Sequence, residues 1–146
     1  MAIRSPLETL IELAQRATDD AAKRLGAAIR ALDEAEQKLQ MLVGYRTDYA
    51  LRFELTQAAG ITPMAYRNYQ AFLEKLDNAI RGQQEVVNYA KNKSGVEKFA
   101  WQDSERKRMS YTTLNNRAAQ VALRAESKRD QKAMDEHAAR QAYYRK

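Results

Sequence analysis

Gly60-Ile61-Thr62-Pro63 is the strongest interruption in an otherwise helix-favouring sequence. Gly suits the position just after a helix ends, Thr is a good N-cap, and Pro is favoured at the first position of a helix. We therefore expect one helix to end before this stretch and another to begin at Pro63. Because the connection is so short, the second helix has to return antiparallel to the first.

The residues before this turn carry an apolar repeat that begins at a helix cap. Ser5-Pro6-Leu7-Glu8 matches a capping box, with Ser5 as the N-cap and Glu8 at the third helical position. From there a seven-residue interval separates each member of one apolar row from the next: Leu7, Ala14, Ala21, Ala28, Ala35, Leu42 and Tyr49. The row predicts a first helix over about residues 6–57, roughly 75 Å long, whose alanines favour close approach of a second helix.

The residues after the turn carry a second stripe with helical spacing, made of Tyr69, Leu73, Leu76, Ile80, Val87 and Ala90. The stripe weakens at Asn92-Lys93-Ser94-Gly95 and resumes from Val96. We expect a turn at residues 58–62 and a second helix over about residues 63–140, either bent or broken near Gly95. The polar residues from Lys128 to Lys146 are expected to fray. The whole chain, residues 1–146, is thus predicted to be a single all-α domain, an antiparallel two-helix coiled-coil hairpin.

The composition argues against an enzyme. The chain has no Cys and a single His, and its five Gly are scattered, so thiolate metal sites, His-based triads and Gly-rich phosphate loops are excluded. We expect no cofactor and no metal site. No segment approaches the roughly 20 apolar residues of a membrane span, and the N-terminus lacks a secretory signal. The sequence predicts a cytoplasmic protein without direct membrane insertion.

The net charge of +6 is concentrated at one end of the chain. Residues 91–146 hold 14 Lys and Arg against 7 Asp and Glu, while the rest is nearly balanced. Within this segment, Glu105-Arg106-Lys107-Arg108 lies near Trp101 and Tyr111, a combination found on nucleic-acid-binding surfaces. The run is interrupted by acids and no known binding motif frames it, so a solvated helix face is favoured. No nucleic-acid partner is expected.

A group of large apolar residues lies on both sides of the turn. In an antiparallel hairpin, residues whose numbers share one sum lie at one level, and a sum of 121 aligns three pairs: Tyr49 with Phe72, Tyr45 with Leu76, and Leu42 with Ala79. Further large apolar residues lie at this end: Met41, Val43, Leu51, Phe53, Tyr69, Leu73 and Ile80. This is more than a two-helix seam can bury. The cluster is either an exposed interaction site or ordinary core at a wider part of the hairpin.

Several segments, in this order and spacing, resemble the FliJ family of flagellar type III export proteins. They are Leu7-Glu8-Thr9-Leu10, Asp19-Asp20-Ala21-Ala22, Leu25-Gly26, Gln40-Met41-Leu42 with Tyr45 and Tyr49, Asn68-Tyr69-Gln70 with Phe72, Ala125-Glu126, Asp130-Gln131-Lys132 and Met134-Asp135-Glu136. Together they span nearly the whole chain.

The resemblance implies a coiled coil like the central stalk of rotary ATPases. Its paired termini would insert into the hexameric flagellar export ATPase, and its turn region would contact the cytoplasmic domain of the export gate protein. The family is also linked to export chaperones, and its place would be cytoplasmic, peripheral at the inner-membrane base of the flagellum. The family's gate-binding positions fall on Leu42, Tyr45, Tyr49, Phe72, Leu76 and Ala79. Two more positions depart from the residues of some members: Lys38 and Gln83.

Basic residues toward the other end are the candidates for contact with acidic loops of the ATPase ring: Arg16, Lys23, Arg24, Arg124, Lys128 and Arg129. Two other functions remain open from the sequence. The chain is alternatively a general export chaperone or chaperone escort that binds cargo directly. A basic coiled coil that binds nucleic acid is the less favoured alternative.

Overall fold

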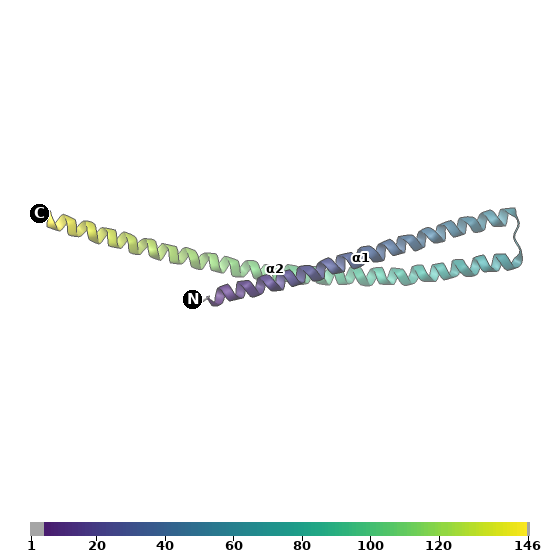
Figure 1. Cartoon of the computed structure of the whole chain (residues 1–146), viewed down its shortest axis with the longest axis horizontal. Helices are drawn as coiled ribbons and strands as arrows, with labels where there is room; N and C mark the ends of the chain where they lie inside the picture. The colour runs from purple at the N-terminus through teal and green to yellow at the C-terminus, as the bar shows by residue number, and fades with distance from the viewer. Residues whose placement is uncertain (1–4, 146) are drawn as a thin grey trace. The chain divides into compact units, whose positions relative to one another are not determined.

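The structure, a computed structural model, describes residues 5–145 and consists there of two helices joined by a short connection (Figure 1). Helix α1 spans Pro6–Ala59 and helix α2 spans Pro63–Tyr144. The predicted all-α helical hairpin is confirmed. Helix α1 ends two residues later than expected and helix α2 four residues later. Residues 1–4 and 146, which the predicted domain includes, lie outside the described residues.

The caps predicted from the sequence are formed. The Ser5 hydroxyl accepts a hydrogen bond of 3.2 Å from the Glu8 amide, and the Thr62 hydroxyl accepts one of 3.2 Å from the Ala65 amide. Gly60 has a φ of 105°, a conformation that residues with a side chain adopt only at a cost. These contacts fix where α1 begins and ends and where α2 begins, so the turn is specified locally.

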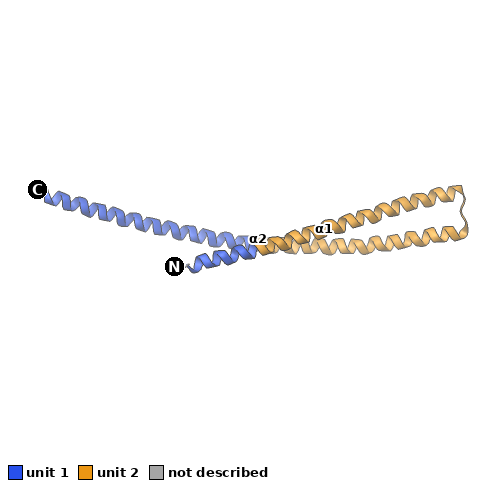
Figure 2. Ribbon diagram, in the orientation of Figure 1, with its two compact units in different colours: residues 1–18, 103–146 blue, residues 19–102 orange. Residues whose placement is uncertain are grey.

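Contacts divide the chain into two units, shown in different colours in Figure 2. The unit of residues 19–102 is the hairpin itself, and its seam is built from small and medium-sized side chains. Those at most 9% exposed are Ala21, Ala28 and Ala35 on α1 and Leu76, Gln83, Val87 and Ala90 on α2. The alanine row therefore lies at the helix–helix contact, as the repeat predicted.

Polar contacts across the seam fix the register of the hairpin. The Arg24 guanidinium lies 3.3 Å from the Glu97 carboxylate, and these residue numbers sum to 121. Arg46 and Asp77 form a second ion pair of 2.9 Å, close to the same register. The two stripes beside the turn are therefore aligned as the sequence predicted.

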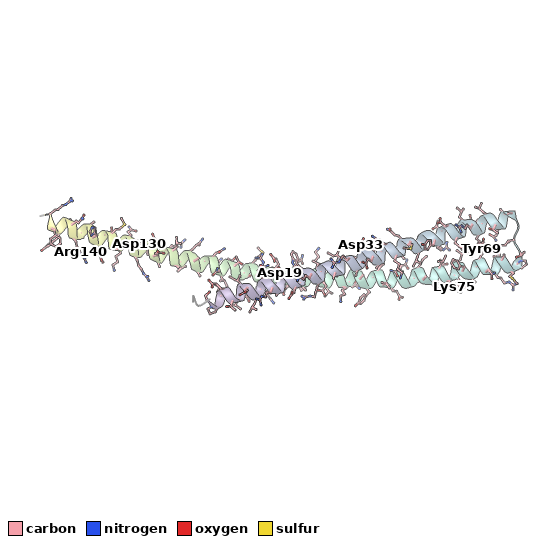
Figure 3. All side chains as sticks on the ribbon, in the orientation of Figure 1. Asp19, Asp33, Tyr69, Lys75, Asp130 and Arg140 are labelled. Atoms are coloured by element: carbon pink, nitrogen blue, oxygen red, sulfur yellow. The ribbon has the colours of Figure 1, made fainter. Side chains whose placement is uncertain are left out.

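The other unit comprises, within the described chain, residues 5–18, which include the start of α1, and residues 103–145, which include the end of α2. Leu10, Ala14 and Ala17 share a shallow hollow with Tyr111 and its α2 neighbours, so these segments pack together. From residue 116 onward every described residue is exposed. Asp130 and Arg140, labelled in Figure 3, lie on this part of α2, which has no facing helix.

Helix α2 decides between two alternatives that the sequence left open and corrects one expectation. It passes through Gly95 without interruption, so no break separates residues 63–92 from those beyond. The residues from Lys128 to Tyr144 are helical rather than frayed. This segment is rich in Ala, Arg, Lys and Gln, residues of high helix propensity, and contains neither Gly nor Pro. Lys146, the last residue of the expected frayed end, lies outside the described residues.

Candidate partner-binding site

Five aromatic rings from both helices meet beside the turn. The Tyr49 ring centroid lies 4.4 Å from that of Phe72 and 5.0 Å from that of Tyr69. The Phe53 centroid lies 5.2 Å from that of Tyr69 and 5.4 Å from that of Tyr66. All four pairs are tilted, a geometry favourable to aromatic rings. The rings hold the helices together here and widen the seam beyond what alanines would give.

Next to these rings lies a groove of about 340 Å³, which we call the aromatic groove, lined by Tyr45, Asp48, Tyr49, Arg52, Phe72 and Leu76. Four of these residues belong to the set named by the family resemblance. Asp48 and Arg52 add one negative and one positive charge. The groove therefore offers aromatic surface with polar groups nearby, as the centres of protein interfaces commonly do.

Exposure differs among the predicted site residues. Tyr45 is 56% exposed and Phe72 is 44% exposed, whereas Leu76 is only 9% exposed. Leu42 and Tyr49 are half-buried, and Ala79 is exposed. Leu76 is thus core, while Tyr45 and Phe72 present apolar surface to solvent. The cluster is therefore core at Leu76 and solvent-exposed at Tyr45 and Phe72.

Lys38 and Gln83, the two positions that depart from the residues of some family members, differ in exposure. Lys38 is exposed. Gln83 is buried in the seam, where its side-chain amide donates a hydrogen bond of 3.0 Å to the Ala35 carbonyl. Gln83 therefore contributes to helix pairing, and its side chain is not offered to a partner.

The basic residues considered for the ATPase ring do not form one cluster. Arg24 belongs to unit 19–102 and pairs with Glu97, while Arg16 belongs to the other unit and pairs with Glu12 at 3.3 Å. The remaining four are exposed: Lys23, Arg124, Lys128 and Arg129. Of these, Arg124, Lys128 and Arg129 lie on the part of α2 that has no facing helix.

Acidic neighbours compensate part of the basic segment around Arg108. The Arg108 guanidinium donates a hydrogen bond of 3.1 Å to Glu105, and this bond holds the pKa of the Glu105 carboxyl below its ordinary value. Lys107 lies 3.5 Å from Asp103. Lys107 and Arg108 are thus each paired with a carboxylate of the same helix.

Asp48 and Arg52 line the aromatic groove although the sequence did not predict them as site residues. Each lies three residues after a predicted tyrosine, Tyr45 or Tyr49, and residues with this spacing are neighbours on a helix surface. That spacing was the available signal. Among residues 5–145, no group of His, Asp and Glu side chains is arranged to hold a metal ion. Neither helix, within that range, is long and apolar enough to cross a membrane.

A family model described as "Flagellar FliJ protein" matches residues 3–146. The chain belongs to the FliJ family. Among curated FliJ proteins, that of Escherichia coli (strain K12) is 35% identical over 142 residues, and that of Salmonella typhi is 34% identical over the same length. Each match covers 97% of this chain and 97% of the relative.

Among solved structures, a YscO homolog from Chlamydia trachomatis matches with a TM-score of 0.43 and 18% identity, covering 92% of each chain.

The FliJ family consists of non-catalytic components of the flagellar export apparatus. Membership assigns this chain to flagellum assembly and protein export.

Proposed function

We propose that this FliJ-family chain links the flagellar export ATPase to the export gate, with the aromatic groove as its gate-binding surface. Energy from nucleotide hydrolysis in the ATPase would reach the gate through the paired helices. In this role the chain carries out no catalysis, needs no cofactor and works in the cytoplasm at the inner-membrane base of the flagellum. Chaperones that deliver export substrates are a third class of partner.

The observation that carries the proposal is the composition and exposure of the aromatic groove. Tyr45 and Phe72 come from different helices, yet both line this groove and expose about half of their surface. Exposed aromatic residues over a rigid, packed floor are the usual energetic centre of a protein interface. The floor here is Leu76, which the seam holds in place.

The ATPase contact is proposed for the part of α2 that has no facing helix. Its residues 116–144 are all exposed, and a helix of about 29 residues without tertiary packing has only its own helix propensity to stabilise it. A partner that surrounds this segment would supply the missing contacts. Arg124, Lys128 and Arg129 would meet acidic groups of that partner.

Binding of the gate protein's cytoplasmic domain to a double variant, Tyr45→Ala with Phe72→Ala, tests the proposed gate site. We expect affinity to fall by about 2–4 kcal/mol, roughly thirty- to thousand-fold, because both aromatic contacts are removed. Isothermal titration calorimetry measures the affinity, and circular dichroism checks that helicity is unchanged. The matched control is Leu51→Ala with Leu55→Ala, which removes exposed apolar side chains at the same end but outside the groove.

The control variant should bind like the unaltered chain. If the Tyr45/Phe72 variant retained full affinity while the control lost it, the gate site would lie on another face of the turn region.

Stimulation of the ATPase by a charge-reversed chain, Arg124→Glu with Lys128→Glu, tests the proposed ring contact. We expect stimulation to be lost while gate binding persists, because the two contacts use different residues. Arg67→Glu with Lys75→Glu makes the same charge change near the turn and should leave stimulation intact. Equal stimulation of the ATPase by the unaltered chain and by both charge-reversed variants would count against ring contact through residues 116–145.

A further inference from the structure

A second groove lies in unit 19–102, away from the turn, and no residue of it belongs to the aromatic groove. It encloses about 360 Å³, and we call it the alanine groove, lined by Arg24, Ala27, Ala28, Ala31, Val86, Tyr89, Ala90, Lys93 and Glu97. It lies about 15 Å along α2 from the aromatic groove, because Val86 follows Leu76 by ten residue steps of about 1.5 Å each.

The alanine groove exists because small side chains from α1 face larger ones from α2. Its floor is the seam itself, where Ala28 and Ala90 are 6% and 8% exposed. On the α2 side, Val86 is 50% exposed and Tyr89 is 69% exposed. On the α1 side, Ala31 is too short to cover them. The alanine groove is therefore apolar and open to solvent, and Val86 and Tyr89 of α2 border it on one side.

The apolar surface continues along α2 beyond this groove. A second hollow of about 280 Å³ shares Tyr89, Lys93 and Glu97 with it and adds Asn92 and Val96. Val96 is 66% exposed. The span from residue 86 to residue 96 is about 15 Å, or roughly three turns of helix. A surface of this length matches one short helix.

The charges at the rim favour an acidic occupant. Glu97 is engaged by Arg24 across the seam at 3.3 Å. Lys93 forms no ion pair among the described residues, so its charge is available at the edge of the alanine groove. An occupant with a carboxylate at this point would be complementary to Lys93. A second copy of this chain, at +6, would be repelled on average.

We propose that the alanine groove docks an acidic amphipathic helix of a partner protein, about three turns long. One large apolar side chain of that helix would lie over Ala28 and Ala90, between Ala31 and Tyr89, and one carboxylate would lie at Lys93. Alanine allows the backbones to approach closely, and laying an apolar helix face into a groove is a common mode of recognition. This surface is separate from the proposed gate site, so the chain binds both partners at once.

The probe for the test is a synthetic helical peptide of about fourteen residues, roughly 21 Å long. It carries Leu along one face and Glu elsewhere, with a fluorophore at one end. A second peptide has the same Leu face with Lys in place of Glu. Fluorescence anisotropy with the full-length chain measures both affinities. We expect saturable binding of the acidic peptide and binding at least about tenfold weaker for the basic one.

Paired variants locate the bound peptide. Ala31→Leu fills the alanine groove, and Lys93→Glu reverses its rim charge, so each should weaken binding of the acidic peptide by about tenfold or more. Ala22→Leu and Lys91→Glu make the same changes at exposed positions that line neither hollow, and both should bind like the unaltered chain. All four substitutions suit a helix, so loss of folding does not explain a difference.

Because the chain has no Cys, a single cysteine gives an independent position test. Val86→Cys should form a disulfide with a cysteine placed in the Leu face of the acidic peptide, and Asn88→Cys, which lines neither hollow, should not.

Three results would overturn the proposal. They are absence of saturable binding, equal binding of the acidic peptide to the Ala31→Leu and Ala22→Leu variants, and equal affinity for the acidic and basic peptides. Analytical ultracentrifugation without peptide tests for self-association of the chain. Self-association that is lost in the Ala31→Leu variant would instead assign the alanine groove to a second copy of the chain. A Tyr45→Ala, Phe72→Ala chain that still binds the peptide would separate this site from the gate site, so either proposal can fail alone.

Discussion

Replacing Gly60 by alanine is expected to destabilise the hairpin even though the new methyl group has room. Gly60 has a φ of 105°, and a Cβ at this position would meet no other atom within 4 Å. The cost therefore comes only from forcing an L-residue into a left-handed backbone conformation, about 1–2 kcal/mol. This lowers the ratio of folded to unfolded chain by roughly five- to thirty-fold.

Gly95→Ala is the matched comparison, because Gly95 lies within α2 and its Cβ would also meet nothing within 4 Å. There the same added methyl group should stabilise the helix by about 0.5–1 kcal/mol. The two variants should therefore differ by roughly 1.5–3 kcal/mol in free energy of unfolding, with opposite signs. Urea denaturation followed by far-UV circular dichroism measures both.

A stabilising effect of Gly60→Ala would refute the turn. It would mean that residue 60 does not adopt a left-handed conformation in solution and that α1 does not end there as described. The alignment of residues 42–49 with residues 72–79, on which the aromatic groove depends, would then require a different turn.

Two further predictions concern the seam and the basic segment. Val87→Ala removes two methyl groups from a side chain that is only 5% exposed, so it should lower the free energy of unfolding by about 1–2.5 kcal/mol. Val86→Ala, at a position that is 50% exposed, should lower it by less than about 0.5 kcal/mol. Equal losses in urea denaturation would contradict the placement of Val87 in the seam. The Glu105 carboxyl should titrate below the ordinary glutamate pKa in an NMR pH titration, because it accepts a hydrogen bond from Arg108, and Arg108→Gln should raise that pKa. Since the folded pKa is the lower one, this bond stabilises the protein above the unfolded pKa and stops doing so as pH falls through the folded pKa; an unchanged titration in the variant would show that the bond is absent.

The sequence specified the turn and the caps because each depends on a few adjacent residues. Ser5, Gly60, Thr62 and Pro63 act within one helical turn of their own position, so their roles follow from local chemistry alone. The register follows next, since a short turn fixes which residues lie at one level. The predicted pairing of Tyr49 with Phe72 is confirmed by the 4.4 Å between their ring centroids.

Features that depend on the rotation of one helix against the other were not predicted. Gln83 and Leu76, which the family resemblance places among or beside the gate-binding positions, both face the seam instead. The Gln83 side-chain amide donates a hydrogen bond to the Ala35 carbonyl there. The alanine groove depends on how far Val86 and Tyr89 lie outside the contact, which periodicity does not determine. The helical end of α2 was not predicted because it has few apolar residues; helix propensity, which is high in this segment, favours the helix there instead.

Site-specific photo-crosslinking in living cells tests the central claim most directly. A photoreactive phenylalanine at position 45 would lie in the aromatic groove, and one at position 124 would lie on the part of α2 without a facing helix. We predict that position 45 yields an adduct with the export gate protein and position 124 an adduct with the export ATPase. The proposed arrangement would be contradicted if position 45 formed an adduct with the ATPase. It would also be contradicted if position 124 formed an adduct with the gate protein and none with the ATPase.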